Sequence, residues 1–348
     1  MKTSSRSLRW IVLCIILILV FVGNLYIGAV RIPICHVTDI LTGNASTSVS
    51  DATRFIVLES RLPAAITAIF GGSGLAVSGL LLQTAFRNPL AGPSILGINS
   101  GASLGVAVVM LIGGGSMIAG TIEFGTEFAI IAGAMAGSFM IMAILLALSA
   151  WLRNDLMLLI AGILVGYLAS SFIMILNFSA TSDGVQNYVI WGMGSFTALP
   201  FERMPVFIIL TMTGLAFAIA LAKPLDLLLL GNDYARNLGI NIRNTRNMLL
   251  FATGILSATA TAFCGPVAFI GLAVPHIARM VMKTDTHRIL LPATIIIGAI
   301  IGASCNLLSV LPSSGFIPWI KSASLLPLNA VTPLFGVPVI LYVILHRR

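Results

Sequence analysis

Residues 62–86 and 88–122 form two uncharged, largely apolar runs that are separated only by Arg87. Each run is long enough for a membrane-spanning helix, which needs about 20 apolar residues. The second run begins with a cluster of helix breakers, Asn88-Pro89-Leu90-Ala91-Gly92-Pro93. Because lipid cannot satisfy free backbone N–H and C=O groups, such a break must lie at the membrane edge or be buried in protein. The two runs therefore predict consecutive membrane helices joined by a buried or interfacial turn.

Similar uncharged runs recur along the chain, in which 58% of the 348 residues are hydrophobic and only 9% are charged. Soluble domains carry about 25% charged residues, so we expect an integral membrane protein and not a globular enzyme. The runs predict an all-α fold of about ten transmembrane helices in a single permease domain, 1–348. The expected spans are 10–30, 62–84, 94–113, 128–150, 156–178, 204–222, 247–263, 266–282, 289–311 and 326–345. A further short helix is expected at 187–196, around Trp191.

The charged residues are distributed unevenly between the two predicted sides of the membrane. With an inner N-terminus and ten alternating spans, the inner side holds 14 basic and four acidic residues, and the outer side holds five basic and seven acidic residues. Basic residues concentrate on the cytoplasmic side of membrane proteins. The sequence therefore predicts a multi-pass protein with both termini in the cytoplasm. This asymmetry accounts for the net charge of +8, and no binding to nucleic acid is expected.

The inner stretch 223–246 differs from the apolar runs around it. It reads KPLDLLLLGNDYARNLGINIRNTR, which is polar, basic and interrupted by proline and glycine. Either Asn232 or Asp233 can cap a short helix that Gly239 ends. We expect a folded cytoplasmic element, which either receives a partner protein or only folds back onto the membrane helices.

Two absences bear on the energy source. The sequence has no G-x-x-x-x-G-K-[ST] motif, so the chain is not expected to bind ATP through a P-loop. No Asp or Glu lies within a predicted span, whereas ion-coupled carriers usually keep ionisable residues inside the membrane. A transporter that takes its energy from a partner is favoured, and an ion-coupled secondary carrier or a passive channel is the alternative. Because His and Cys are scattered, no metal site is expected.

Small residues recur at helical spacing in the second and third predicted spans. Gly71-Gly72-Ser73-Gly74 and Gly79 lie in the second span, and Gly97, Gly101 and Gly105 follow at intervals of four residues. Small residues at this spacing let membrane helices approach closely. We expect close helix contacts here, which are either static packing or sliding contacts in a moving permease.

Four sequence motifs support a more specific interpretation. They are RLP at 61–63, NPLAGPSILG at 88–97, LGNDYARNLG at 230–239 and GPVAFIGLAVPHIAR at 265–279. In this order they resemble motifs of the transmembrane permease subunits of ATP-driven (ABC) importers for iron-siderophores, haem and cobalamin. The resemblance extends over about residues 55–346.

The resemblance implies a fold like that of the cobalamin-importer permease, with cytoplasmic coupling helices, in the bacterial inner membrane. It implies a homodimer with the pathway at its axis, two cytoplasmic ATPase subunits that bind ATP and Mg, and one extracytoplasmic substrate-binding protein. Transport would proceed by alternating access. This chain would be a non-catalytic subunit that binds no cofactor, and the cargo would be an iron-siderophore, haem or cobalamin.

The resemblance also assigns roles to three groups of residues. The ATPase-coupling residues are Leu230, Gly231, Asp233, Ala235, Arg236, Leu238 and Gly239. The residues expected to dock the binding protein are Arg61 and the nearby cations Arg54 and Lys321. The gate and helix-packing residues are Asn88, Pro89, Gly97, Gly271, Pro275, His276 and Arg279. For Arg61 the alternative is that it only anchors the second helix.

Three positions depart from the family pattern. Ala64 replaces the second Arg of an R-L-P-R motif, Asn306 replaces an Asp in the ninth span, and Leu325 replaces the Glu of an E-L-P-x-G motif. In relatives some of these charges face the substrate-delivering protein. Their loss leaves the expected fold unchanged but puts the docking residues in doubt.

Overall fold

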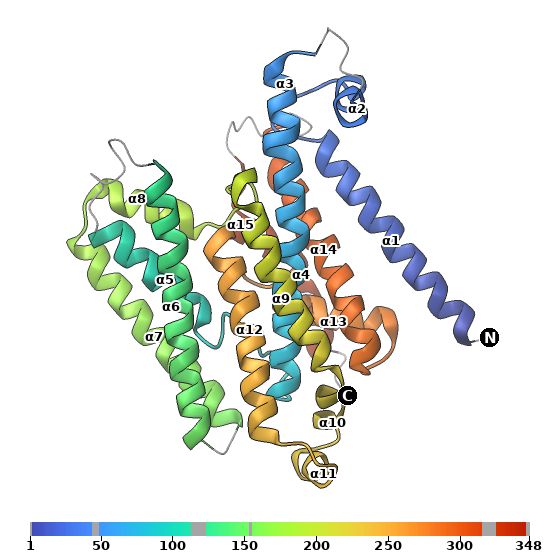
Figure 1. The fold of residues 1–348 in the computed structure, drawn as a ribbon, viewed down its shortest axis with the longest axis vertical. Helices are drawn as coiled ribbons and strands as arrows, with labels where there is room; N and C mark the ends of the chain where they lie inside the picture. The colour runs from blue at the N-terminus through green and yellow to red at the C-terminus, as the bar shows by residue number, and fades with distance from the viewer. Residues whose placement is uncertain (1, 44–48, 113–122, 153–154, 315–324, 346–348) are drawn as a thin grey trace.

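The computed structural model describes residues 2–43, 49–112, 123–152, 155–314 and 325–345. Within these ranges the chain is helical and has no β-strand, as predicted. Figure 1 shows α2 (Ile34–Thr42) and α3 (Asp51–Phe55) at one end of the molecule, and α10 (Ala222–Leu229) and α11 (Asn232–Asn237) at the opposite end. We refer to these as the α2 end and the α11 end.

Among the described residues, seven helices are long and apolar enough to cross a membrane, and three shorter apolar helices lie among them. The long helices are α1 (Lys2–Tyr26), α4 (Leu62–Ala85), α6 (Glu123–Trp151), α7 (Asp155–Ser179), α9 (Met204–Ala220), α12 (Ile242–Cys264) and α14 (His287–Val310). The shorter ones are α5 (Ile98–Ala107, continued by a π-helix to Ile112), α13 (Ile270–Met282) and α15 (Leu328–Leu345). These ten helices coincide with the ten predicted spans.

The third and eighth predicted spans begin later than expected because the backbone before them is not helical. Gly97 precedes α5 with a positive φ of 76°, and Phe269 precedes α13 with a φ of 66°. Both angles lie in the left-handed region, which cannot continue a right-handed helix. The expected short helix around Trp191 is confirmed as α8 (Ser182–Gly192), which begins before the predicted 187.

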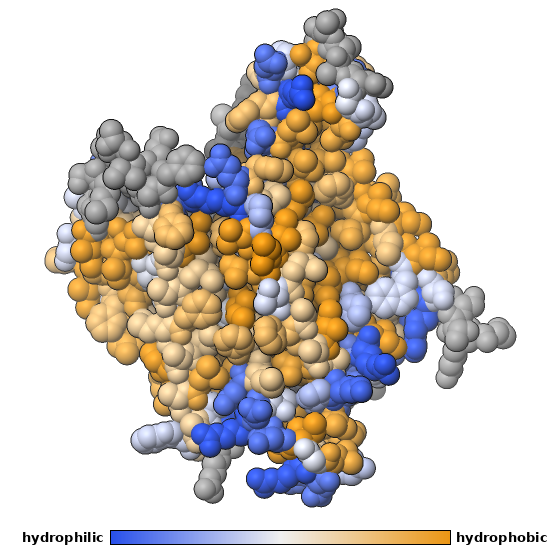
Figure 2. All heavy atoms as spheres, in the orientation of Figure 1, coloured by the Kyte–Doolittle hydropathy of each residue, from blue (hydrophilic) through white to orange (hydrophobic). Residues whose placement is uncertain are grey.

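The surface between the two ends is apolar. Figure 2 shows hydrophobic residues over the middle of the visible face, with hydrophilic residues gathered toward both ends. Large apolar side chains are exposed along the long helices, among them Leu19 of α1 at 64% and Leu164 of α7 at 61%. Exposure on this scale fits a lipid-facing surface, because lipid removes the cost that water would impose on apolar side chains.

Glycines bring the helices of the core into backbone contact, as the spacing of small residues predicts. A Cβ at Gly79 of α4 would collide with the backbone carbonyl oxygen of Gly271 in α13. In the same way, a Cβ at Gly105 of α5 would collide with the carbonyl oxygen of Gly133 in α6. The close packing is therefore confirmed, whereas the choice between static and sliding contacts stays a prediction.

We expect Gly79→Ala to lower the free energy of unfolding by roughly 1–3 kcal/mol or more, because the backbones of α4 and α13 must separate to admit a methyl group. Gly192→Ala is the control, since a Cβ at Gly192 has no neighbour within 4 Å. Thermal unfolding of the detergent-solubilised protein measures both effects. Equal melting temperatures for the two variants would contradict a tight α4–α13 contact.

Candidate functional site

The NPLAGPSILG and GPVAFIGLAVPHIAR motifs meet at the end of α4. The Asn88 Oδ1 accepts a hydrogen bond from the backbone N–H of Leu90 at 2.9 Å, which forms a tight turn directly after the helix. The buried His276 of α13 donates from Nε2 to the carbonyl oxygen of Pro89, also at 2.9 Å. His276 follows Pro275, which lies buried inside α13. These residues therefore fasten the turn to α13.

A second connection crosses the same junction one helical turn further along α13. The Arg279 Nη1 donates to the Oε1 of Gln83 in α4 at 2.7 Å, and the Gln83 Nε2 donates to the carbonyl oxygen of Leu272 at 3.1 Å. The Arg279 Nε also lies 3.5 Å from the Asp285 carboxylate. Sequence reasoning did not single out Gln83, because a lone glutamine in an apolar helix carries no recognisable pattern.

Gly97 and Gly271, one from each motif, lie at close contacts between helices. A Cβ at Gly97 would lie 2.9 Å from the carbonyl oxygen of Gly162 in α7, and a Cβ at Gly271 would lie 2.8 Å from that of Leu75 in α4. The structure thus places the predicted gate and packing residues in contacts between α4, α7 and α13. Their expected part in gating stays a prediction.

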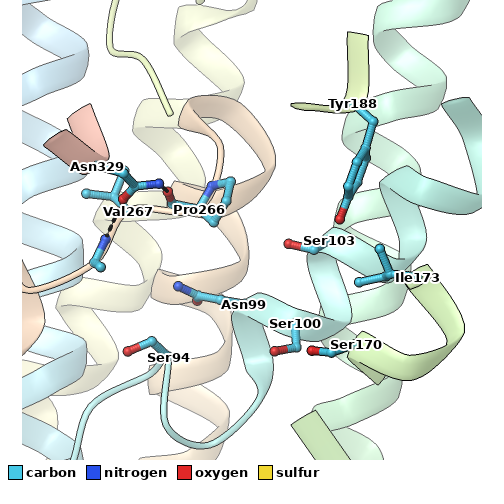
Figure 3. Close-up of a pocket in the computed structure, with 11 residues that line it drawn as sticks. Ser94, Asn99, Ser100, Ser103, Ser170, Ile173, Tyr188, Pro266, Val267 and Asn329 are labelled. Atoms are coloured by element: carbon cyan, nitrogen blue, oxygen red, sulfur yellow. Dashed lines mark hydrogen bonds between the residues drawn. The ribbon is translucent and has the colours of Figure 1, made fainter. Parts of the chain in front are cut away.

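A polar cavity of about 460 Å³ lies between α5, α7, α8, the 266–268 segment and the start of α15 (Figure 3). It is lined by Ser94, Asn99, Ser100, Ser103, Ser170, Ile173, Tyr188, Pro266, Val267, Ala268 and Asn329. Seven of these eleven residues carry a hydroxyl or amide group, and no charged side chain is among them. The cavity can therefore offer hydrogen bonds to a polar solute without holding it by charge.

Two asparagines fix the walls of the polar cavity. The Asn99 Oδ1 accepts hydrogen bonds from the hydroxyls of Ser257 and Thr261 in α12, at 2.9 and 3.2 Å. The Asn329 Nδ2 donates to the carbonyl oxygens of Gly192 and Pro266, at 3.1 and 2.8 Å. Its Oδ1 also accepts from the backbone N–H of Ala268 at 3.2 Å (Figure 3).

Asn329 therefore joins α15 to α8 and to the segment before α13. Sequence analysis registered 325–329 only as a departure from the E-L-P-x-G motif and missed this role. The signal that could have found it is the residue itself, since an amide at the family's glycine position needs several hydrogen-bond partners.

Tyr188 of α8 closes the side of the cavity opposite Asn329 (Figure 3). Burial raises the pKa of the Tyr188 phenol above its usual range, against the opposing effect of a hydrogen bond with the Ser103 side chain. The phenol is therefore neutral at physiological pH. Its ring stacks on Trp191 with the ring centroids 6.2 Å apart.

The backbone before α13 adopts an unusual conformation beside the polar cavity. Gly265 has a φ of 74° and Phe269 a φ of 66°, and only the first is a glycine. A Cβ at Gly336 of α15 would lie 2.6 Å from the Phe269 Cβ, so α15 packs directly on this residue. Non-glycine residues in this region cost of order 1–3 kcal/mol and persist only where the surroundings impose them.

Asn329→Ala is expected to lower the free energy of unfolding by roughly 1–3 kcal/mol, because it leaves two carbonyl groups and one N–H group without a partner. Asn177→Ala in α7 is the matched control, since the Asn177 amide donates only to Ile173 of its own helix. Chemical or thermal unfolding in detergent compares them. If Asn177→Ala lowered the free energy of unfolding as much as Asn329→Ala, the bridging role of Asn329 would be contradicted.

The 223–246 segment contains most of α10, all of α11 and the start of α12, at the α11 end (Figure 1). Leu225 and Leu228 of α10 are buried in the core. Gly231, with a φ of 116°, is the N-cap of α11 and makes no side-chain cap, so the expected capping by Asn232 or Asp233 is wrong. Residues with a side chain rarely adopt the backbone conformation found at position 231, which explains the glycine there. The predicted end of α11 is confirmed, since Gly239 follows Leu238 with a φ of 86°.

The two faces of α11 differ in exposure. Ala235 is completely buried in the core of the chain, which corrects the expectation that it contacts a partner. Tyr234 and Leu238 are 57% and 53% exposed, and Leu230 just before the helix is 61% exposed. Asp233 and Arg236 are also exposed. A mixed apolar and charged surface is therefore available at the α11 end.

Arg61 does not present its charge at the α2 end. It is only 6% exposed, and its guanidinium donates to the carbonyl oxygens of Leu25 and Tyr26 at 2.9 Å and to that of Val30. These carbonyl groups lie at the end of α1 and just beyond it, where intrahelical partners run out. The docking role expected of Arg61 is thereby corrected to the anchoring alternative. Among the docking candidates Arg54 of α3 is exposed, and Lys321 lies outside the described residues.

The three departures from the family pattern share one location. Ala64, Asn306 and Leu325 all line a cavity of about 280 Å³ beside Arg61. The Asn306 Nδ2 donates to the Asn24 Oδ1 at 2.8 Å, which joins α14 to α1 without charge. The substitutions therefore replace several charges at one place with neutral side chains.

Metal-binding groups are not clustered in the part of the chain that the structure describes. No three His, Cys, Asp or Glu residues there are arranged to hold a metal ion. All four cysteines are free, with Cys14 and Cys35 exposed and Cys264 and Cys305 buried.

The chain is similar to known proteins over nearly its whole length. The model of the FecCD transport family matches residues 15–346. The hemin transport system permease protein HmuU of Yersinia pestis is 33% identical over 339 residues, which cover 97% of this chain and 95% of that protein. The vitamin B12 import system permease protein BtuC of Klebsiella pneumoniae is 31% identical over 295 residues, or 85% of this chain and 84% of that protein.

A solved structure has the same fold. It is described as an inward-facing conformation of a metal-chelate type ABC transporter, with a TM-score of 0.79 and 26% sequence identity. The match covers 96% of each chain.

Proposed function

Because the chain belongs to the FecCD transport family and is thereby a permease subunit of an ABC importer, we propose that it moves an iron-siderophore, haem or cobalamin across the bacterial inner membrane. The observation that supports this cargo class best is the uncharged polar cavity between α5, α7, α8 and α15. Chelates of this class are bulky and carry many hydrogen-bonding groups. A largely apolar lining with several hydroxyl and amide groups can hydrogen-bond such a solute at a few points without holding it by charge.

The proposed mechanism is alternating access driven by a partner. Two cytoplasmic ATPase subunits bind ATP and Mg, and their closure displaces residues 226–242 at the α11 end. Since the membrane helices meet through glycine contacts such as Gly79–Gly271, a small displacement changes which side of the polar cavity is open. The chain itself binds no cofactor and catalyses no reaction in this scheme.

The proposed assembly contains two copies of this chain, two ATPase subunits and one extracytoplasmic binding protein. Exposed apolar residues on α7 and α15, such as Leu164 and Leu334, can face either lipid or the second copy. Native mass spectrometry of the complex purified with its ATPase tests the stoichiometry. A mass equal to two permease and two ATPase subunits supports the proposal, and a single permease with its ATPase contradicts it.

The binding protein is proposed to dock at the α2 end. Arg54 is the exposed cation of α3, whereas Arg61 is buried and Arg203 pairs with Glu127 at 2.9 Å. Exposed charges of this kind act mainly on association rate and its salt dependence. Binding of the partner binding protein to a panel of siderophores, haem and cobalamin would identify the cargo within the class.

The proposed orientation places the α11 end in the cytoplasm. In a cysteine-free background, a single cysteine at Arg236 is expected to react with a membrane-impermeant thiol reagent only from the cytoplasmic side. A cysteine at Asp183 of α8 is expected to react only from outside. Ala235→Cys is the control, because its buried side chain should remain unlabelled from either side. Labelling of position 236 from outside would overturn the orientation.

A further inference from the structure

The start of α14 is capped by a residue of another helix. Thr286, the N-cap of α14, makes no side-chain capping bond. Instead the Asp226 carboxylate of α10 accepts a hydrogen bond from the backbone N–H of His287 at 2.6 Å. A carboxylate is favourable at a helix N-terminus, because it satisfies a free N–H group and lies at the positive end of the helix dipole. Asp226 thus joins α10 to α14.

The imidazole of His287 extends this connection into the core. Its Nδ1–H donates to the same Asp226 oxygen at 2.8 Å, and its Nε2 shares a hydrogen bond with the Thr84 hydroxyl at 2.9 Å. His287 is 1% and Thr84 2% exposed, so water cannot replace either partner. Thr84 lies in the last turn of α4, and its hydroxyl oxygen is also 3.0 Å from the Leu80 carbonyl oxygen. One ring therefore bridges an α10 carboxylate and an α4 hydroxyl.

The hydrogen-bonded side chains of Asp226, His287 and Thr84 lie between the exposed surface of α11 and the centre of the membrane domain. α10 is separated from α11 only by Leu230 and Gly231. α4 packs against α12, α13 and α14, and most of its length is buried. The preceding residue, Gln83, holds α4 to α13 through Arg279. The last turn of α4 is thus tied to α13 through Gln83 and to α10 and α14 through Thr84 and His287.

We propose that Asp226, His287 and Thr84 form a positioning link that makes α10, α14 and α4 move together when the ATPase displaces the coupling segment. This inference rests on the proposed function. Hydrogen bonds in a dry interior resist rearrangement, because a broken bond leaves a buried polar group without a partner. The link therefore converts displacement of α10 into displacement of α4. Its loss partly uncouples ATP hydrolysis from transport.

The test is Thr84→Val in the complete importer, because this change removes the hydroxyl and keeps the shape and charge of the site. Thr294→Val in α14 is the matched control. Thr294 is also fully buried, but its hydroxyl donates only to Leu290 of its own helix, at 2.7 Å. Thr84→Ser is the conservative variant that restores the hydroxyl. The measured quantity is the number of ATP molecules hydrolysed per chelate imported in proteoliposomes, together with the melting temperature.

Thr84→Val is expected to assemble with the ATPase and to hydrolyse ATP, with about five-fold more ATP consumed per imported chelate. Thr84→Ser and Thr294→Val should keep the wild-type ratio. An unchanged ratio in Thr84→Val, or an equal change in Thr294→Val, would overturn the link. Failure of the wild-type complex to show any ATP-dependent uptake would instead overturn the proposed function, so the two failures are distinguishable.

Discussion

Leu238→Asp is expected to abolish ATP-driven uptake by removing the ATPase from the complex. Tyr234 of α11 and Leu238, the residue directly after it, are exposed, whereas Ala235 is buried. Truncating a central apolar residue of an interface often costs about 2 kcal/mol or more, which is roughly a 30-fold loss of affinity. A carboxylate adds the cost of burying an unpaired charge. Affinity of the solubilised permease for its ATPase measures the effect directly.

The control for this experiment is Leu41→Asp in α2. Leu41 is 40% exposed at the opposite end of the molecule, so the chemical change is the same and the location differs. It should leave the ATPase affinity unchanged. Wild-type affinity and uptake in Leu238→Asp would show that 226–242 only folds back onto the membrane domain. By contrast, Ala235→Glu should reduce the amount of folded protein, since the structure offers no space for that side chain.

Ser170→Trp is expected to block transport while leaving the assembly intact. Ser170 of α7 lies opposite Ser100 of α5 at the wall of the polar cavity (Figure 3). Ser170 is exposed on this wall, so an indole ring there can project into space that a chelate needs, and the steric clash should lower uptake roughly ten-fold or more. ATPase binding and docking of the binding protein should persist, because both surfaces lie at the ends of the molecule.

Ser171→Trp supplies the comparison within the same helix. Ser171 is exposed, donates to Tyr167 of its own helix and does not line the polar cavity. Its replacement should therefore preserve uptake. Uptake assays in proteoliposomes, normalised to assembled complex, distinguish the two variants. Normal uptake in Ser170→Trp would remove this cavity from the pathway.

Much of the fold could be predicted because membrane constraints act locally along the sequence. Uncharged runs of span length predict helices, and the breaker cluster 88–93 predicts the turn after α4. The regular spacing of Gly101 and Gly105 predicts a close helix contact, and the structure shows that α6 is the partner. The exact start of α13 was not predictable, because no sequence pattern marks the positive φ of Phe269, a non-glycine residue that packs against the remote Gly336.

The functional details depended on contacts that are remote in sequence. Arg61 is held by carbonyl groups up to 36 residues away, so its burial leaves no local signal. The buried side of α11 is equally hidden, since a helix of six residues is too short to show periodicity. Asp226 and His287 are 61 residues apart, and only the folded chain brings them together.

The central claim is that this chain imports a metal chelate with energy from a partner ATPase. Its most direct test is uptake of radiolabelled chelate into proteoliposomes that contain the permease and its ATPase, with the loaded binding protein on the outer face. We expect accumulation that requires enclosed ATP and Mg and is absent with a non-hydrolysable ATP analogue. Equal flux without ATP, or flux driven by an ion gradient alone, would contradict the account.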